Sequence, residues 1–285
     1  MNAIDLLYSQ GFGTRRHCIA LIEEGYFELS TGLANSQQAS PPEFRICRDA
    51  YCEIEEFLKD TVSPAHDQSH DQSHDQSHDQ THHLSHDLSG LAYRVESVIW
   101  HYHPTAYVML NKPMGIECSQ KPSNWPSVYT LLPAPLRQRP RKGASPGVQA
   151  VGRLDQDTTG LLLLSDDGQF IHKMSSPKHH VPKVYEVTTE DTLDQRVCDK
   201  LLSGVHLKDE YELTFAHSAE LTGETTLRLT LTQGKYHQVK RMLGATGHKV
   251  VKLHRSHIGP LNIPIELSFA MWRWLSKAEV DSLFL

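Results

Sequence analysis

Hydrophobic and polar positions are arranged most distinctly in the middle of the 285-residue chain. Two short apolar runs, residues 148–151 and 161–164, have the length and composition of buried strands. The polar loop between them carries Arg153, Asp155 and Asp157, and an Asp-Gly turn follows the second run. The pattern predicts a charged loop held between two buried strands. An ordinary solvated connection is the alternative, because Asp-rich turns are common.

Elsewhere the chain alternates between helical and strand-like periods. Helices are predicted at residues 3–9, 14–24, 169–176 and 192–202 and from residue 276 onward, and strands at 106–110, 184–187, 225–233 and 248–258. Thr14 has the side chain of a helix N-cap, and Gly25 and Gly204 follow helical patterns where a helix would end. From Leu91 onward this mixture predicts an α+β fold.

Residues 66–89 form a tetrapeptide array, His-Asp-Gln-Ser, that degrades toward its C-terminal end. A strict period of four with almost no apolar residue cannot bury a face, so the segment is predicted to be a disordered linker. The chain then divides into an N-terminal module at 1–60, a linker at 61–90 and a larger domain at 91–285. Histidines four positions apart beside aspartates would allow a transition-metal site if the array became helical, and that alternative stays open.

The formal net charge of −6 is unevenly distributed along the chain. Residues 1–60 carry five basic and ten acidic side chains, residues 61–90 carry five acidic and no basic ones, and residues 91–285 carry 23 basic and 19 acidic ones. Four basic side chains of the third region lie within six residues: Arg137, Arg139, Arg141 and Lys142. A local basic patch favours phosphate groups, so a nucleic-acid partner is compatible with the acidic total.

The five cysteines show neither metal-ligand spacing nor the dense even framework of a disulfide-stabilised domain. Free thiols in a reducing cytosol fit this usage, and a zinc site is not expected. No apolar run reaches the roughly 18 residues of a membrane span, and the N-terminus lacks the basic-then-apolar pattern of a signal peptide. A soluble cytoplasmic protein without a membrane partner is therefore expected.

The residues of the central loop also form a motif. Gly152-Arg153-Leu154-Asp155, the run 158–164 and Asp167-Gly168 together resemble the signature of pseudouridine synthases. The resemblance implies an α+β catalytic domain with a mostly antiparallel or mixed sheet flanked by helices. It also implies that Asp155 is the catalytic carboxylate of uridine isomerisation and that Arg153 helps hold the target nucleotide out of its stack.

Two further segments resemble elements of the same family. Residues 111–115, Asn-Lys-Pro-Met-Gly, follow the strand predicted at 106–110, and Lys112 within them is expected to support the catalytic loop or to bind a phosphate. Lys183 and Tyr185 occupy the family's Lys-x-Tyr element, which implies that Tyr185 lies beside the catalytic aspartate and that Lys183 takes part in substrate binding. Without the resemblance, Lys112 would be a solvated turn lysine and Tyr185 would be packing in a half-buried strand.

Residues 234–242 resemble a third family element, a turn that opens a helix. The basic residue after His-Gln-Val in this element pairs with the catalytic aspartate, and that residue is Lys240 here. Arg241 beside it is a candidate contact to the substrate. A basic helix start with Lys235, Lys240 and Arg241 is also compatible with a solvated or phosphate-binding face, which is the alternative.

The N-terminal module carries a resemblance of its own. Residues 14–29 are similar to the small RNA-binding module named after ribosomal protein S4, which makes its fold α/β. Arg15 and Arg16, at the start of the second predicted helix, would then contact RNA. The chain departs from the S4 pattern after Leu29, where a polar Ser/Gln/Pro stretch replaces the usual turn. A helical packing module without RNA affinity is the alternative.

Residues 176–180 are closest to the small-subunit branch of the pseudouridine synthases. This resemblance implies isomerisation of one uridine of 16S ribosomal RNA, uridine 516, by a monomer that needs no cofactor or metal. Its partner would be ribosomal RNA or the assembling 30S particle. The alternatives are a 23S ribosomal RNA enzyme of the same family, a non-catalytic RNA-binding or ribosome-assembly protein, and a glycosidase that uses Asp155 and Asp157 as paired carboxylates.

Overall fold

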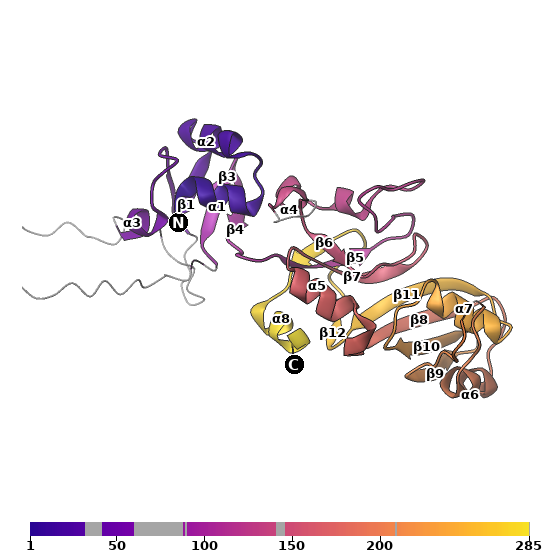
Figure 1. Ribbon diagram of the computed structural model, residues 1–285. Helices are drawn as coiled ribbons and strands as arrows, with labels where there is room; N and C mark the ends of the chain where they lie inside the picture. The colour runs from indigo at the N-terminus through magenta and orange to yellow at the C-terminus, as the bar shows by residue number, and fades with distance from the viewer. Residues whose placement is uncertain (32–41, 60–87, 89, 141–145, 209, 285) are drawn as a thin grey trace, which may run out of the picture. The chain divides into compact units, whose positions relative to one another are not determined.

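The computed structural model describes residues 1–31, 42–59, 88, 90–140, 146–208 and 210–284. These residues form two compact units. Unit 1 comprises Met1–Pro104 and Gln138–Pro146, and unit 2 comprises Thr105–Arg137 and Gly147–Leu285. Both units contain helices and strands (Figure 1), so the predicted α+β class is confirmed. Within the described ranges, no helix is long and apolar enough to span a membrane.

Unit 1 packs short helices against a four-stranded antiparallel sheet. Its elements are α1 (Ala3–Gln10), α2 (Arg15–Glu23), β1 (Phe27–Ser30), β2 (Phe44–Ile46), α3 (Ile54–Lys59), β3 (Ala92–Val95) and β4 (Val98–His101). The strand order is β2-β1-β3-β4. Thr14 caps α2 as predicted, because its side chain accepts a hydrogen bond from the backbone N–H of His17 (3.3 Å).

The boundary between the units differs from the one predicted at residue 91. Strand β1 pairs with β3, which the chain reaches only after the repeat, and β3 pairs with β4. Tyr93 of β3 is buried in the same core as Phe27 of β1. Residues up to Pro104 therefore complete the N-terminal sheet, because β1 would otherwise keep one edge unpaired. The larger domain begins at Thr105.

The linker predicted at 61–90 falls largely outside the described residues. Leu88 is an exception, because it is described and is buried in the core of unit 1 with Leu91. The end of the predicted linker is thus part of a packed domain. Disorder and metal binding of the His-Asp-Gln-Ser array both concern residues outside the described ranges.

Arg139, one of the four side chains of the predicted basic patch, is buried in unit 1. Its guanidinium donates to the side-chain oxygen of Gln10 (3.1 Å) and to the carbonyl oxygen of His103 (2.8 Å). This arginine therefore stabilises the fold and does not present a surface charge to phosphate. Arg141 and Lys142 lie outside the described residues.

Unit 2 is built on a nine-stranded sheet. Its strands are β5 (Tyr107–Lys112), β6 (Gln149–Val151), β7 (Thr159–Ser165), β8 (Lys183–Thr189), β9 (Ser218–Gly223), β10 (Thr226–Leu231), β11 (Val250–Ile258), β12 (Leu261–Asn262) and β13 (Trp272–Trp274). The main path is β13-β5-β7-β11-β8-β10-β9, with β6 on β7 and β12 on β11. Strands β11 and β7 pair in parallel and the other described pairs are antiparallel, which confirms the predicted mixed sheet.

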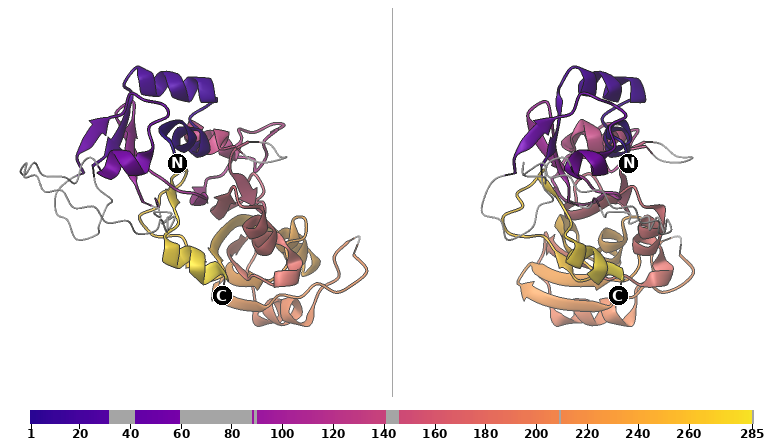
Figure 2. Two further views of the ribbon diagram at one scale, coloured as in Figure 1. Left: turned by 60° about the vertical axis from the view of Figure 1, so that its left-hand side comes forward. Right: turned by 90° about the vertical axis from the view of Figure 1, so that its left-hand side faces the viewer.

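Helices flank this sheet. They are η1 (Val128–Leu131), α4 (Ala134–Gln138), α5 (Gly168–Ser175), η2 (Pro177–His179), α6 (Gln195–Ser203), α7 (Gln238–Ala245) and α8 (Lys277–Phe284). Leu201 of α6 and Met242 of α7 share one core with Leu229 of β10. The C-terminal helix α8, drawn in yellow, stays beside the strands of its unit in both turned views (Figure 2), and its Leu283 enters another core with Phe170.

Strand β7 explains why the run 161–164 is apolar throughout. Leu162 and Leu164 face one hydrophobic core, whereas Leu161 and Leu163 face another, and all four are fully buried. Successive side chains of a strand point to opposite faces, so a strand covered on both faces is apolar at every position. The loop that precedes β7 is therefore anchored to the centre of the sheet.

Candidate active site

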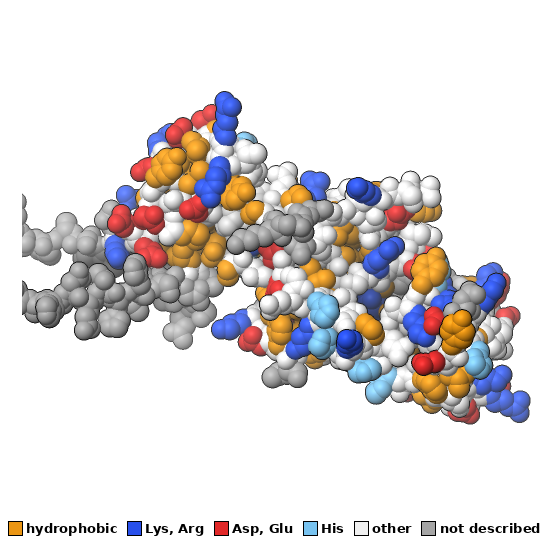
Figure 3. Space-filling view, viewed as in Figure 1, with side chains coloured by type: hydrophobic (Ala, Val, Ile, Leu, Met, Phe, Trp, Pro, Cys, Tyr) orange, Lys and Arg blue, Asp and Glu red, His pale blue; other side chains and the backbone are white. Residues whose placement is uncertain are grey.

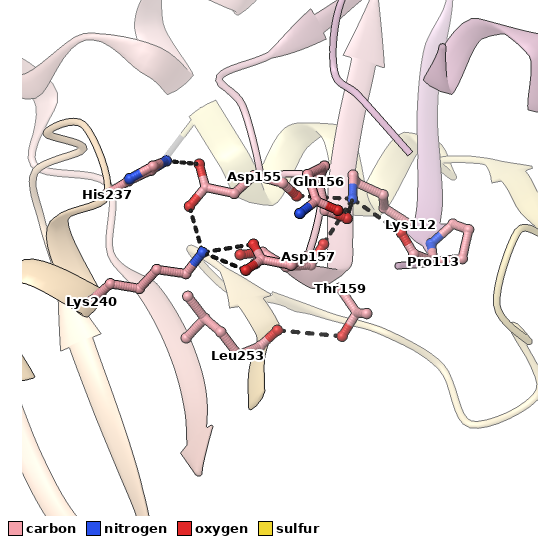
Figure 4. A network of polar contacts seen from close by, with 10 residues as sticks. Lys112, Pro113, Asp155, Gln156, Asp157, Thr159, His237, Lys240 and Leu253 are labelled. Atoms are coloured by element: carbon pink, nitrogen blue, oxygen red, sulfur yellow. Dashed lines mark hydrogen bonds and ion pairs between the residues drawn. The ribbon is translucent and has the colours of Figure 1, made fainter. Parts of the chain in front are cut away.

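The loop between β6 and β7 carries the predicted catalytic motif, and Lys112 holds its backbone. The ammonium group of Lys112 donates to four carbonyl oxygens, those of Pro113 (3.0 Å), Asp155 (3.0 Å), Gln156 (3.3 Å) and Thr158 (2.8 Å) (Figure 4). The side chain is fully buried, and burial lowers the pKa of its ammonium group. Its donors face protein carbonyls, so the geometry favours loop support, one of the two roles predicted for Lys112, over phosphate binding.

Four charged or titratable side chains meet at this loop (Figure 4). Lys240 Nζ lies 3.3 Å from Asp155 Oδ2, so the two residues predicted to pair are in contact. The same ammonium group lies closer to Asp157, at 2.6 and 2.8 Å from its two oxygens. His237 Nε2 approaches Asp155 Oδ1 at 3.3 Å. One carboxylate is therefore held between a lysine and a histidine, and a second carboxylate holds the lysine.

The surroundings of Lys240 favour its charged form. Burial opposes the charge, but the hydrogen bond to Asp157 and the charges of both carboxylates raise the pKa of Lys240 above its usual value. A protonated lysine in turn favours the ionised state of a carboxylate within a few ångströms. The arrangement thus supports a negative charge on Asp155 in a partly enclosed site.

The turn before α7 positions Lys240 and His237. His237 adopts a left-handed backbone conformation (φ 49°) immediately before the helix. Lys235 and Gln238 close this turn, because the N–H of Lys235 donates to Gln238 Oε1 (2.9 Å) and the N–H of Gln238 donates to the carbonyl of Lys235 (3.2 Å). Lys240 lies in the first turn of α7, and helical side chains point toward the N-terminal end. Its ammonium group consequently reaches the loop that carries Asp155.

Asp155 borders a cavity of about 330 Å³ in unit 2. Arg153, Lys183, Tyr185 and Lys240 also line it. The lining includes six aliphatic side chains, those of Val151, Leu154, Leu231, Val239, Leu253 and Ile258. The fold thus brings together four segments of the sequence, at 151–158, 174–185, 231–240 and 253–258. The cavity combines a carboxylate, several cations, an aromatic ring and apolar walls.

The chain matches the RNA pseudouridylate synthase family over residues 106–245. It is 40% identical over 180 residues to ribosomal small subunit pseudouridine synthase A of Escherichia coli (strain K12), an alignment that covers 63% of this chain and 74% of that protein. The protein belongs to the pseudouridine synthase family. The protein of the same name from Haemophilus influenzae is 40% identical over 177 residues, which cover 62% of this chain and 73% of that protein. A crystal structure of a pseudouridylate synthase has a TM-score of 0.58 and 27% identity, with 99% of both chains covered.

As a pseudouridine synthase, the protein is an isomerase, and its three predicted catalytic residues line one cavity. These residues are Asp155, Tyr185 and Lys240. Two of the predicted substrate-binding residues, Arg153 and Lys183, line the same cavity. Their roles in the reaction are proposals that the geometry supports.

Arg241, also predicted to bind the substrate, is engaged within the protein. Its guanidinium donates to the carbonyl oxygens of Tyr236 (3.3 Å) and Lys208 and lies 3.5 Å from Glu210. Lys235 donates to the same Glu210 carboxylate (3.0 Å), and these contacts lower the pKa of Glu210. The geometry therefore favours a role in fixing the turn before α7 over the predicted contact to substrate.

The two arginines predicted to bind RNA in unit 1 differ in their contacts. Arg15 forms an ion pair with Asp5 (2.8 Å), and its guanidinium lies 4.8 Å from the centroid of the Tyr8 ring. Arg16, the next residue of α2, is exposed. The RNA contact of these arginines stays a prediction, as does the resemblance of unit 1 to the S4 module.

Sequence reasoning missed three residues of this site: Asp157, His237 and Arg255. The sequence suggests only a glycosidase role for Asp157, although it stands two positions from Asp155 on the same loop. His237 belongs to the third family element, but the motif assigns it no role. Arg255, buried in β11 and lining the cavity, had no local signal because one arginine in a strand pattern does not reveal which face it occupies.

Among the described residues, no group of three or more His, Cys, Asp or Glu side chains is placed to hold a metal ion. The five cysteines, all described, are free thiols. The candidate site therefore consists of the cavity and the side chains around Asp155.

Proposed function

We propose that the protein converts one uridine of 16S ribosomal RNA, uridine 516, to pseudouridine, with Asp155 as the catalytic carboxylate. The observation that carries the proposal is the Asp155 carboxylate, held between Lys240 and His237 at a cavity that Tyr185 also lines. Support for the target comes from the relatives, which are named ribosomal small subunit pseudouridine synthase A. Free ribosomal RNA or the assembling 30S particle in the cytoplasm would be the partner of a monomeric enzyme.

The proposed reaction begins with extrusion of the uridine, because its glycosidic bond is inaccessible in folded RNA. Arg153 lies on the same loop as Asp155 and is exposed, so its guanidinium can contact a phosphate or stack where the base had been. The flipped base would enter the cavity between the apolar walls. Tyr185 supplies an aromatic ring there for stacking on the uracil.

The chemical steps break the bond between C1′ and N1 and form a bond between C1′ and C5. Asp155 must be ionised to attack the nucleotide or to stabilise a sugar cation. Lys240 favours that ionised state through its charge at 3.3 Å. The hydroxyl of Tyr185 can assist removal of the C5 proton after the base has been rejoined. These steps require no cofactor or metal.

RNA binding is supported by basic side chains near the cavity. In the space-filling view, lysine, arginine and histidine side chains gather over α5 and the segment after it (Figure 3). Lys178, His179 and His180 are exposed in this segment, and Met174 and Ser175 just before it line the cavity. Contacts between such side chains and phosphates would position the RNA without reading its sequence.

The target can be tested in a strain of Escherichia coli from which the small subunit pseudouridine synthase A has been deleted. We expect this chain to restore the carbodiimide-dependent primer-extension stop at uridine 516, and the Asp155→Asn variant to leave it absent. Restoration of a stop in 23S ribosomal RNA instead would replace the target with the large-subunit alternative. Full restoration by Asp155→Asn would refute the proposed catalytic residue.

A further inference from the structure

Lys183 and Arg255 line the cavity, and neither forms an ion pair with any residue that the structure describes. Within the described ranges, the ammonium group of Lys183 forms no hydrogen bond or ion pair. Arg255 is only 3% exposed; its Nε donates to the carbonyl of Leu161 (2.8 Å), but its buried Nη2 has no hydrogen-bond partner. Buried polar groups are normally satisfied, so an unpaired guanidinium nitrogen next to an unpaired lysine requires an explanation.

The two side chains reach the cavity from neighbouring strands. In the register of β8 and β11, Arg255 lies opposite Tyr185, and Lys183 lies opposite Ile258. Lys183 and Tyr185 are two positions apart on β8, so they share the face that carries the aromatic ring. A base stacked on Tyr185 would therefore have its edge beside two cations.

The proximity of the two cations disfavours both charges. Burial lowers the pKa of Lys183 to about 8, and the nearby charge of Arg255 contributes in the same direction. An arrangement of this kind is unfavourable in the empty protein and becomes favourable when a negative group enters. The bound partner should therefore carry negative charge or develop it during the reaction.

We propose that Lys183 and Arg255 form an oxygen-binding subsite for the uracil base, which stabilises the negative charge that the base acquires during isomerisation. The inference rests on the proposed role of Asp155 and names a further pair of residues for the same reaction. When the bond between C1′ and N1 breaks, its electron pair stays on N1, and the resulting uracil anion spreads its charge onto O2 and O4. The bond from C5 to C1′ then uses the base's electrons. The C5 proton leaves to a base or to water, with the Tyr185 hydroxyl assisting, and N1 takes up a proton, so the isomerised base is again neutral.

The subsite serves either attack by Asp155. If the carboxylate adds to C6 of the uracil, the electrons of the C5–C6 double bond move toward O4, which again becomes negatively charged. Both routes place the charge on a carbonyl oxygen at the edge of the ring. Donors aimed at an oxygen where charge develops act as an oxyanion hole does.

A backbone phosphate is the competing ligand, and two observations argue against it. Arg255 is almost completely buried, whereas phosphates of a bound RNA lie along its outer surface. The surrounding wall includes Val151, Leu253 and Ile258, which suit the face of a base. The flat base is thus the better match for the position next to these cations.

The test compares Lys183→Met, which removes the charge at similar length, with Lys183→Arg, which keeps it. Lys252→Met is the matched control, because Lys252 is an exposed lysine on β11. We expect Lys183→Met to lower the single-turnover rate roughly 10²-fold, as the loss of one oxyanion donor does. The KM for RNA and the salt dependence of binding should stay close to those of the wild type, and the melting temperature should not fall. Lys183→Arg should recover at least a tenth of the wild-type rate.

Two results would overturn the subsite. A raised KM and a shallower salt dependence with an unchanged rate would assign Lys183 to a phosphate. A lower melting temperature that accounts for the lost activity would assign it to the fold. These comparisons need any RNA that the wild-type enzyme modifies, so they remain decisive if the target is not uridine 516. Asp155→Asn measured in parallel separates failure of the proposed carboxylate from failure of the subsite.

Arg255→Lys provides a second measurement that does not depend on Lys183. This variant keeps a positive charge but loses the buried Nη2 donor, and we expect a rate loss of about 10-fold with the KM unchanged. The double variant with Lys183→Met should lose less than the product of the two single losses if both residues act on one ligand. Exactly multiplicative losses would contradict a shared oxygen subsite.

Discussion

The loop side of the cavity and its β8–β11 side hold charge in opposite ways. On the loop side, Asp155 and Asp157 share one cation, Lys240, and His237 contacts Asp155 as well. Beside β8 and β11, two cations are near each other without a carboxylate. Paired charges hold their side chains in a fixed geometry before the substrate binds. Unpaired cations gain a partner only when the substrate brings or develops a negative charge.

The two sides of the cavity therefore have different roles in the proposed reaction. The loop side must keep Asp155 ionised and in place, and a lysine held by a second carboxylate does so without any ligand. The strand side must recognise a charge that exists only during the reaction, so a permanent protein anion there would compete with it. The two sides should therefore respond differently to substitution: one through the state of Asp155, the other through the charge on the base.

The largest effect is expected for Asp155→Asn, which removes the reacting carboxylate. The single-turnover rate should fall by on the order of 10⁴-fold or more. The Kd for RNA should stay within about 3-fold, because phosphate contacts carry most of the binding. Lys240 keeps Asp157 as its partner, so the melting temperature should change little. Substantial turnover in this variant would show that the loop side does not carry the chemistry.

Lys240→Met should be the next most damaging change. It removes the cation that lies 3.3 Å from Asp155 and 2.6 Å from Asp157. The rate should fall roughly 10²-fold, because the reacting carboxylate loses the positive charge that contacts it. Lys240→Arg keeps a cation and is the control, which should retain most of the wild-type rate. A wild-type rate in Lys240→Met would show that the lysine does not support the reaction at Asp155.

Much of the fold of unit 2 followed from local pattern. The strands predicted at 106–110, 161–164, 225–233 and 248–258 correspond to β5, β7, β10 and β11, and the helix predicted at 192–202 corresponds to α6. In each of these segments, the spacing of the apolar residues follows from which of its own side chains are buried. The two units divide after Pro104 and not at residue 91, because the partner of β1 comes from beyond the repeat, and no local period reveals a pairing over that separation.

The site shows the same division between local and long-range information. Family motifs pointed to Asp155 and Lys240, which are in contact. They did not show that Lys240 lies closer to Asp157, because that preference depends on how the loop turns above Lys112. The position of Arg255 in the site could not be predicted either, since its burial depends on the pairing of β11 with both β7 and β8.

Asp157→Asn should have a smaller effect on the rate. The variant loses the closest contact of Lys240, which keeps its contact with Asp155. We expect the rate at pH 7 to change by less than about 10-fold, since Asp157 is well exposed and such pairs contribute little. A loss as large as that of Asp155→Asn would mean that Asp157 takes part in the chemistry, as paired carboxylates would.

The smallest effect is expected on stability, and it tests the strand side without any RNA. The charged or titratable groups that share the cavity with Lys183 are Arg153, Asp155, Tyr185, Lys235, Tyr236, His237, Lys240 and Arg255. The pKa of Lys183 is about 8 in the folded protein and about 10.5 in an unfolded chain. Below pH 8 both states bind the proton, and the folded state bears the full unfavourable charge. Between these values the unfolded state binds more protons, so the wild type gains stability as pH rises.

Lys183→Met removes this dependence. At pH 7 we therefore expect the variant to be more stable than the wild type by about 1 to 3 kcal/mol, since solvent in the open cavity weakens the penalty. The gap should narrow as pH rises through 8 toward 10.5, where the lysine becomes neutral in both states. Urea unfolding at pH 7, 8.5 and 9.5 measures the difference, with Lys252→Met as the control that should show no such trend. A variant less stable than the wild type at pH 7 would mean that Lys183 has a stabilising partner in the folded protein, and the contrast between the two sides of the cavity would then disappear.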